Sequence, residues 1–306
     1  GLDTAASAGA PGARPMRRAA LVCLAAFVVL PAAAGAEELK ALDGIVRDYQ
    51  GALPQWFEQL GPHASRLFAL LATLEICWAA IAWALNPAHA TLGGLLRKAL
   101  LLGILFAAVE LYPFWLPAVV RSFEAAGQSA SAEPTLNPSD VVGRGIHLGT
   151  ALQLRAASFG LLAHPAALIT SSFTSLIVIL AYVAIAAQLV LALTETAIVL
   201  ATGPFWLAFA AFRGTAQIAD NFLAYALHVG IKIFFLYLLV AVGVHLTSLW
   251  VDYLLLTVFD PFDLTIYSQI LAGALVLAFL VWRIPGDIAS RLSGGVGFRI
   301  REALSE

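Results

Sequence analysis

The stretch AALITSSFTSLIVILAYVAIAAQLVLALTETAIVLATGPFWLAFAAF, residues 166–212, decides the fold class of this chain. It carries one charged residue, Glu195, and is much longer than the ~20 apolar residues that cross a bilayer as a helix. At about 1.5 Å per residue, it forms either one long, tilted and protruding helix of roughly 35 residues followed by a broken apolar piece, or a hairpin of two spans. Both alternatives place it in a membrane.

The composition of the whole chain agrees with a membrane location. Of its 306 residues, 61% are hydrophobic and 12% are charged, whereas ordinary soluble domains have roughly 45–50% apolar and about 25% charged residues. We therefore expect an all-α, polytopic membrane protein and exclude a water-soluble enzyme. The net charge of −2 provides no positive field that could hold duplex DNA, so direct binding of DNA is not expected.

The N-terminal region has the pattern of a secretory signal peptide over residues 16–36. Met16 and two arginines precede the apolar run 19–30, and Ala34-Gly35-Ala36 offers a small-residue cleavage site. We expect residues 1–15 to be a non-native leader. The alternative of an uncleaved first span remains open, although the apolar run is short for ~20 spanning residues. In both cases the mature chain begins in the periplasm of a bacterial cell.

The mature chain divides into five segments that together contain about five transmembrane helices. They are a periplasmic amphipathic segment at 37–63, two spans within 64–120, a central periplasmic region at 121–165, a transmembrane core at 166–285 and a cytoplasmic basic tail at 286–306. In the first segment, the spacing predicts a helix over 38–53 that Pro54 ends. The second span, residues 96–120, is expected to bend at Pro113 and Pro117. In the core, an amphipathic stretch at 213–229 precedes one span, and a last span follows at 268–282.

Positive charge orients these spans with the N-terminus outside and the C-terminus inside. Arg97 and Lys98 fall in the first connection, Arg213 follows the long apolar run, and four arginines follow the last span. If residues 166–200 form one span, all of these charges face the cytoplasm, whereas a hairpin would place the arginine-rich tail in the periplasm. One span is therefore favoured, with residues 201–212 as a re-entrant or interfacial piece packed against protein. The expected location is the bacterial inner membrane.

The central region at 121–165 begins with a Ser/Ala/Glu/Pro-rich loop and continues as a helix. Asn137-Pro138-Ser139-Asp140 supplies an N-cap, a proline at the first helical position and an early carboxylate. One face of this helix carries only small residues: Gly145, Gly149, Ala156 and Gly160. The helix either lies on its own bundle through this face or packs closely against another subunit. The sequence leaves both alternatives open.

Ionisable side chains at membrane depth are expensive and are therefore candidates for function. They are Glu75, Glu110, Glu195, Lys232 and His245. These residues form no recognisable catalytic set, the histidines lack the spacing of a metal site, and no nucleotide-binding loop occurs. We therefore expect no enzymatic activity, cofactor or metal. Glu195 is either a boundary residue near the helix end or part of an intramembrane polar seam with Lys232 and Glu110.

The layout resembles the TrbL type of conjugal-transfer membrane protein. The resemblance is carried by the long apolar helix with a Glu followed by Gly203-Pro204-Phe205, by the stretch 220–243 with Gly230 and Lys232, and by Trp282-Arg283-Ile284-Pro285 at the end of the last span. It covers about residues 38–298. It implies the polytopic inner-membrane subunit of a type IV secretion system, which would form a channel or platform and perform no catalysis itself.

The resemblance also implies partners. These are other type IV secretion subunits, namely a bitopic periplasmic scaffold, pilin subunits and secretion ATPases, besides membrane lipids and further copies of the chain. A DNA–protein or protein substrate would be contacted only indirectly. The alternative function is a small-solute transporter or ion channel with Glu110, Glu195 and Lys232 along the path. The sequence has no paired broken helices of the kind that inverted-repeat transporters show, but this alternative stays open.

Overall fold

The computed structural model describes residues 36–85, 92–130, 137–158, 165–256, 265–294 and residue 300, and every regular element in these ranges is a helix. In chain order they are α2 (Ala36–Leu85), α3 (Leu92–Glu110), α4 (Tyr112–Ala130), α5 (Pro138–Ser158), α6 (Pro165–Leu207), the 3-10 helix η2 (Ala208–Ala211), α7 (Ala216–Leu256) and α8 (Thr265–Ser293). The predicted all-α fold class is confirmed. Residues 1–35, which hold nearly all of the predicted signal peptide, lie outside the described ranges.

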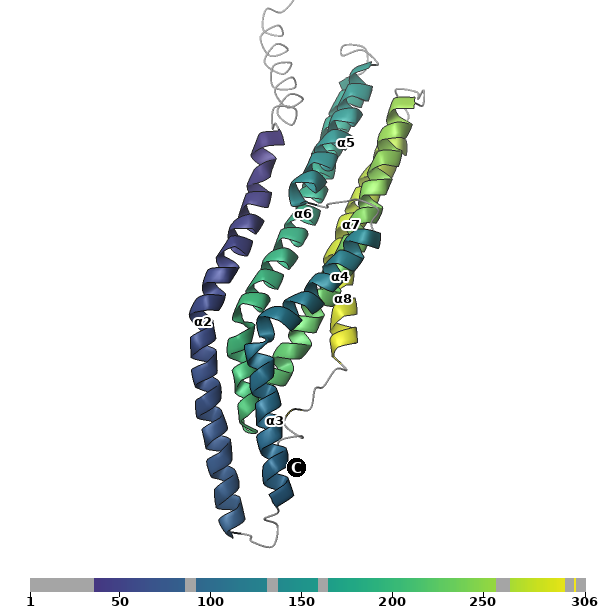
Figure 1. The fold of residues 1–306 in the computed structure, drawn as a ribbon. Helices are drawn as coiled ribbons and strands as arrows, with labels where there is room; N and C mark the ends of the chain where they lie inside the picture. Colours follow the sequence, from purple (N-terminus) through teal and green to yellow (C-terminus); the bar gives the residue numbers. More distant parts are fainter. Residues whose placement is uncertain are drawn as a thin grey trace, which may run out of the picture.

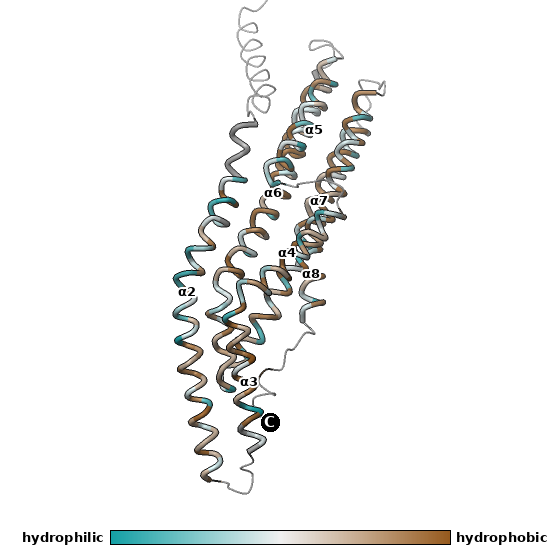
Figure 2. The backbone as a smooth tube through the Cα atoms, in the orientation of Figure 1, coloured by the Kyte–Doolittle hydropathy of each residue, from teal (hydrophilic) through white to brown (hydrophobic). Residues whose placement is uncertain are grey.

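The helices form an elongated bundle around α6 (Figure 1). α6 contacts α2, α5, α7 and α8, and the elbow between α3 and α4 also touches it. Among the described residues, four helices are long and apolar enough to cross a membrane, and α3 with α4 adds a fifth if this bent pair is counted as one span. Figure 2 shows that hydrophobic residues predominate along α6 and α7, whereas the coloured turns in the first half of α2 are more hydrophilic. A polytopic membrane protein with about five spans, as predicted, has this arrangement.

The apolar run that opened the sequence analysis is one helix and not a hairpin. α6 continues through Glu195 and Pro204 to Leu207, and only then do η2 and a turn reverse the chain. Its 43 residues measure about 65 Å at 1.5 Å per residue, roughly twice the ~30 Å thickness of the hydrocarbon core. The prediction of a single long helix is therefore confirmed. The separate piece predicted at 201–212 is wrong over residues 201–207, because these residues continue α6 and the irregular part is limited to η2 and the turn after it.

Three expected helix ends are not ends. α2 passes through Pro54 and Pro62, the amphipathic stretch at 213–229 joins the following span in α7, and α8 passes through Pro285. The prediction that Pro54 ends its helix is therefore wrong. An internal proline removes one hydrogen bond and bends a helix at a cost of about 3 kcal/mol, and packing against neighbouring helices can offset that cost. Figure 1 shows that α2 is bowed along its length.

The second predicted span is bent, as expected, but at a different residue. The axes of Leu96–Glu110 and Tyr112–Ala130 differ by 66°, and the break lies at Leu111, ahead of Pro113. Pro113 lies in the first turn of α4, where a proline is tolerated because the N–H that it lacks would have no partner within the helix. The break therefore precedes Pro113, whereas Pro117 lies within α4. Residues 121–130 continue α4, so the loop predicted there is wrong over these residues.

A hydrogen bond from this elbow explains the Gly203-Pro204 pair near the end of α6. Pro204 has no N–H, so the carbonyl of Leu200, four residues earlier, lacks its helical donor. The Tyr112 hydroxyl, which is fully buried, donates to the carbonyls of Val199 and Leu200, each at 3.1 Å. Gly203 makes this approach possible because a Cβ there would overlap the Tyr112 ring. The elbow is thereby fixed to α6.

α5 begins where the sequence predicted. The Asn137 carbonyl accepts hydrogen bonds from the N–H groups of Asp140 and Val141. A carboxylate from another helix also caps this end, since the Ser139 N–H donates to Asp43 of α2 at 3.1 Å. Capping of α5 by α2 was not predicted, because nothing local links residues so far apart in the chain.

The small-residue face of α5 packs on α6 of the same chain. Gly145, Gly149 and Ala156 are buried, and a Cβ at Gly145 would overlap Tyr182 while one at Gly149 would overlap Ser175. The predicted contact between subunits therefore does not use this face in the described structure, because α6 already occupies it. Gly160 lies outside the described residues.

We predict that Gly149→Leu lowers the thermal stability of the purified chain in detergent by several degrees, because the new side chain meets Ser175 and Ile179 of α6. Gly143→Leu is the matched control, since a Cβ there has open space on the same helix. Both changes raise helix propensity equally. Equal melting temperatures for the two variants would contradict the packing of this face on α6.

Candidate functional site

The most informative polar cluster joins α6 and α7 in the middle of the bundle. Because these helices are antiparallel and linked by a short turn, Glu195 of α6 faces the first half of α7. Lys232 Nζ lies 2.5 Å from Glu195 Oε2, and the Tyr225 hydroxyl donates to Glu195 Oε1 at 2.5 Å. We call Glu195, Lys232 and Tyr225 the α6–α7 seam. Each charge of the seam neutralises the other.

The seam opens into a groove of about 700 Å³ along the side of the bundle. The Glu195 and Lys232 side chains are each 24% exposed there. The rest of the groove is mostly apolar and includes a few polar side chains; among its residues are Gln188, Leu191, Ile198, Thr202, Trp206 and Asn221. On α6 the groove extends from Gln188 to Trp206, which is about 27 Å of helix and close to the ~30 Å thickness of a bilayer's hydrocarbon core.

The seam also reaches α8. The His228 ring stacks on Tyr225 with centroids 6.2 Å apart. Ser293 near the end of α8 places its Oγ 3.4 Å from His228 Nδ1. Polar groups from α6, α7 and α8 are therefore connected on one side of the bundle.

A second charged cluster, which the sequence did not reveal as a unit, ties α2 and α3 to the turn after α6. Glu75 of α2 is fully buried, Lys98 Nζ of α3 lies 2.7 Å from its Oε1, and the backbone N–H of Arg213 donates to Oε2 at 3.2 Å. We call these residues the Glu75 cluster. Glu75 was noted in the sequence as an ionisable group at membrane depth, but its partners come from segments distant in the chain.

The two clusters connect helices of the bundle through ion pairs and hydrogen bonds. A catalytic site needs a nucleophile, a base beside it and a place where the reacting atom of a substrate can lie close to both. The α6–α7 seam does not show these three features together. Among the residues that the structure describes, no three His, Cys, Asp or Glu side chains are grouped so that they could hold a metal ion. Charged side chains within apolar helices are costly unless they are paired, so pairs of this kind favour contact between the helices that carry them.

The family model described as TrbL/VirB6 plasmid conjugal transfer protein matches residues 72–284. This match spans the bundle from the second half of α2 to the last turns of α8 and includes both charged clusters. The chain belongs to the TrbL/VirB6 family. The resemblance found in the sequence is thereby confirmed.

Two curated relatives are similar to this TrbL/VirB6 chain over most of its length. A "Probable conjugal transfer protein TrbL" of Sinorhizobium fredii (strain NBRC 101917 / NGR234) is 27% identical over 233 residues, which are 74% of this chain and 58% of the relative. A "Conjugal transfer protein TrbL" of Rhizobium radiobacter is 24% identical over 231 residues, or 75% of this chain and 58% of the relative. The chain thus spans less than two thirds of the length of these relatives.

The structure brings together two of the three residues expected in the polar seam of this family member. Glu195 and Lys232 form an ion pair, and Tyr225 joins them, a contribution that the sequence analysis missed. In the sequence, Tyr225 is one residue of the amphipathic stretch at 213–229 and has no feature that marks it as part of a polar site. Glu110 bonds elsewhere, because it accepts a hydrogen bond of 2.8 Å from Ser65 on α2. The expected seam therefore has to be redrawn without Glu110.

We predict that Glu195→Gln destabilises the chain by about 1–3 kcal/mol, because it leaves the Lys232 charge half-buried without a counter-ion. The double variant Glu195→Gln with Lys232→Met should recover part of this loss, since it removes both charges. Thermal unfolding in detergent measures both effects.

The matched control is Glu58→Gln, which removes the same charge at an exposed position of α2. Two results would contradict the role of the ion pair in joining α6 to α7. One is a melting temperature of Glu195→Gln equal to that of the wild type. The other is a loss of stability in the double variant that exceeds the summed losses of the two single variants.

Proposed function

We propose that the chain is an inner-membrane channel or platform subunit of a type IV secretion system for conjugal transfer. It helps pass a DNA–protein substrate, a protein or pilin subunits across the inner membrane, and ATPases from other genes supply the energy. The observation that carries the proposal is the family match over residues 72–284, which covers the helical bundle and not one short motif.

The proposed orientation places the N-terminus in the periplasm and the C-terminus in the cytoplasm. Lys98 and Arg213 meet at Glu75, so the basic residues of two connections share one end of the bundle, as the positive-inside rule favours. The Ile300 N–H donates to Asp220 near the start of α7 at 3.3 Å, which brings this residue of the tail to the same region. Helices α2, α3 with α4, α6, α7 and α8 then cross the membrane alternately.

The length of α6 supports protein partners in addition to lipid. Large apolar side chains are exposed along both halves of the helix, among them Phe173, Leu180, Leu191 and Ile198. A bilayer covers only about half of a ~65 Å helix, and a large exposed apolar surface in water marks a site of protein contact. We therefore propose that further copies of the chain, pilin subunits or a bitopic periplasmic scaffold cover the remainder.

The rival function, a small-solute transporter or ion channel, draws less support from the arrangement. Its path would have used Glu110, Glu195 and Lys232 together, but Glu110 bonds to Ser65 and the other two residues neutralise each other. A transport path needs a charged or polar group that is available to the solute.

Deletion of the gene should abolish plasmid transfer, and export of protein substrates should be scored separately in the same strain. Complementation by the wild-type gene should restore both activities if the subunit serves a shared conduit, and loss of only one would restrict its cargo. The exposed variant Glu58→Gln serves as the complementation control. Normal transfer and normal export in the deletion strain would refute the proposal.

A reporter fused at Arg213 tests the orientation independently of transfer. We expect a reporter that works only in the cytoplasm to be active at this position and one that works only in the periplasm to be inactive. The reason is that the turn after α6 carries a positive charge, which favours the cytoplasmic side. A fusion at Asp252, near the opposite end of α7, should behave in the reverse manner. Periplasmic activity at Arg213 would overturn the five-span topology.

A further inference from the structure

The Glu75 cluster carries more positive than negative charge. Glu75 contributes the one carboxylate, and its side chain is fully buried, whereas Lys98 and Arg213 each contribute a cation and are 19% and 32% exposed. Within the part of the chain that the structure describes, the cluster therefore has a net charge of +1, and the excess lies on its outer side. An unbalanced charge beside apolar surface is expensive, so a counter-charge from outside the chain would stabilise this arrangement.

The guanidinium of Arg213 still has hydrogen-bond donors to offer. Its Nε lies 4.0 Å from Glu75 Oε2, which is beyond hydrogen-bond distance, and its Cζ lies 5.1 Å from the centroid of the Trp78 ring. Among the described residues, neither Nη group has a partner. The ring of Trp78 holds the guanidinium in place by a cation–π contact. A planar fork with free N–H groups matches the oxygens of a phosphate.

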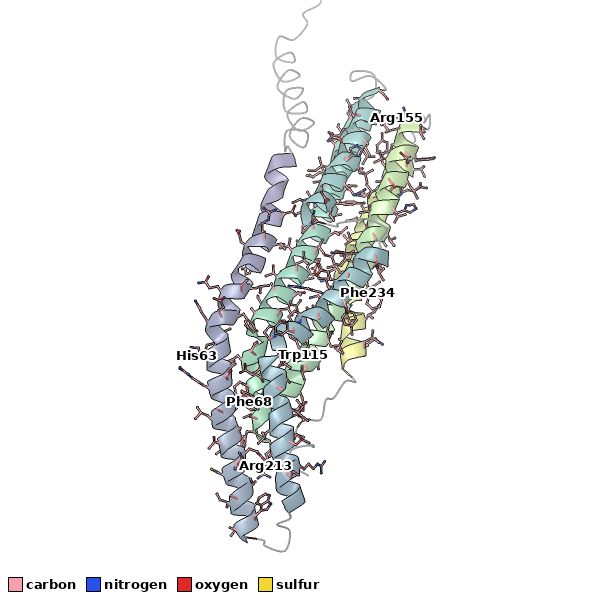
Figure 3. All side chains as sticks on the ribbon, in the orientation of Figure 1. His63, Phe68, Trp115, Arg155, Arg213 and Phe234 are labelled. Carbon is pink, nitrogen blue, oxygen red and sulfur yellow. The ribbon has the colours of Figure 1, made fainter. Side chains whose placement is uncertain are left out.

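The side chains around Arg213 favour binding of a lipid over binding of a water-soluble anion, because they are apolar and exposed. Leu74 and Trp78 flank Glu75 on α2, and about half of each side chain is exposed. Both residues lie in a helix that is apolar enough to span a membrane, and tryptophan is typical of the level where headgroups meet acyl chains. Figure 3 shows Arg213 near the end of the bundle where α2 and α3 lie side by side.

We propose that the Glu75 cluster binds the phosphate group of an anionic phospholipid, with an acyl chain of the same lipid on Leu74 and Trp78. Arg213 donates from its Nη groups to the phosphate oxygens, and Lys98 supplies the second positive charge. Glu75, which is buried on the inner side of the cluster, positions both cations. This site is independent of the α6–α7 seam and of the transfer function proposed above, so the failure of either leaves the other standing.

The test uses the full chain in detergent and counts bound lipids by native mass spectrometry. Phosphatidylglycerol, which is anionic, and phosphatidylcholine, which is zwitterionic, are titrated separately, and inorganic phosphate is added as a competitor. We expect tighter retention of phosphatidylglycerol, and an approximately tenfold weaker apparent affinity in Arg213→Gln, because charge-assisted hydrogen bonds to the phosphate are lost. Arg213→Lys, which keeps the charge but not the fork, should lose less.

Arg283→Gln is the matched control, since it removes the same charge from an exposed arginine on α8 whose partner is Asp287. The Arg213 variants retain the Lys98–Glu75 pair and the backbone bond to Glu75, and their melting temperatures without lipid establish that the fold persists. If Arg213→Gln and Arg283→Gln bind phosphatidylglycerol equally, the site is wrong. If inorganic phosphate displaces the lipid at similar concentration, the cluster binds free phosphate and the lipid assignment is wrong.

Discussion

An apolar helix about twice as long as the hydrocarbon core is thick cannot be covered by lipid alone, and the rest of this bundle is arranged around that constraint. α5 covers the first half of α6 through a face of small residues, where Gly145 and Gly149 let the two backbones approach closely. The elbow of α3 and α4 covers the second half, where Tyr112 reaches the carbonyls of Val199 and Leu200. α6 therefore has different neighbours along its length.

Close packing of small residues and polar contacts, more than the hydrophobic effect, favour particular helix pairs in this bundle. Lipid tails are as apolar as leucine, so burial of apolar surface gives little preference for one helix pair over another within a bilayer. Three polar contacts of this bundle each join two different helices: Glu195 with Lys232, Glu75 with Lys98, and Tyr112 with the carbonyls of α6. An unsatisfied charge or carbonyl at this depth is costly, and these pairings therefore restrict the bundle to one arrangement.

The sequence predicted what depends on composition and local pattern, and missed what depends on contacts between distant segments. The single long helix, the bend in the second span and the start of α5 at Asn137 follow from apolar length, proline and capping residues. The continuation of α2 past Pro54 could not be predicted, because packing along α6 offsets the lost hydrogen bond. In the seam, Glu195 and Lys232 were found because charge is rare in apolar helices, whereas Tyr225 is an ordinary aromatic residue until the fold places it beside Glu195.

The two charged clusters differ in net charge, and this difference determines what can lie against each. The α6–α7 seam is neutral overall, so no charged partner is needed beside it. The groove suits an apolar neighbour that carries a hydrogen-bonding side chain. The Glu75 cluster has an excess positive charge with free guanidinium donors, so it suits an anion. An apolar helix against the Glu75 cluster would leave the charge of Arg213 without a counter-charge. An anion in the seam would be repelled by Glu195 unless it displaced that residue from Lys232. The two sites are therefore not interchangeable, and a protein partner is expected at the first and not at the second.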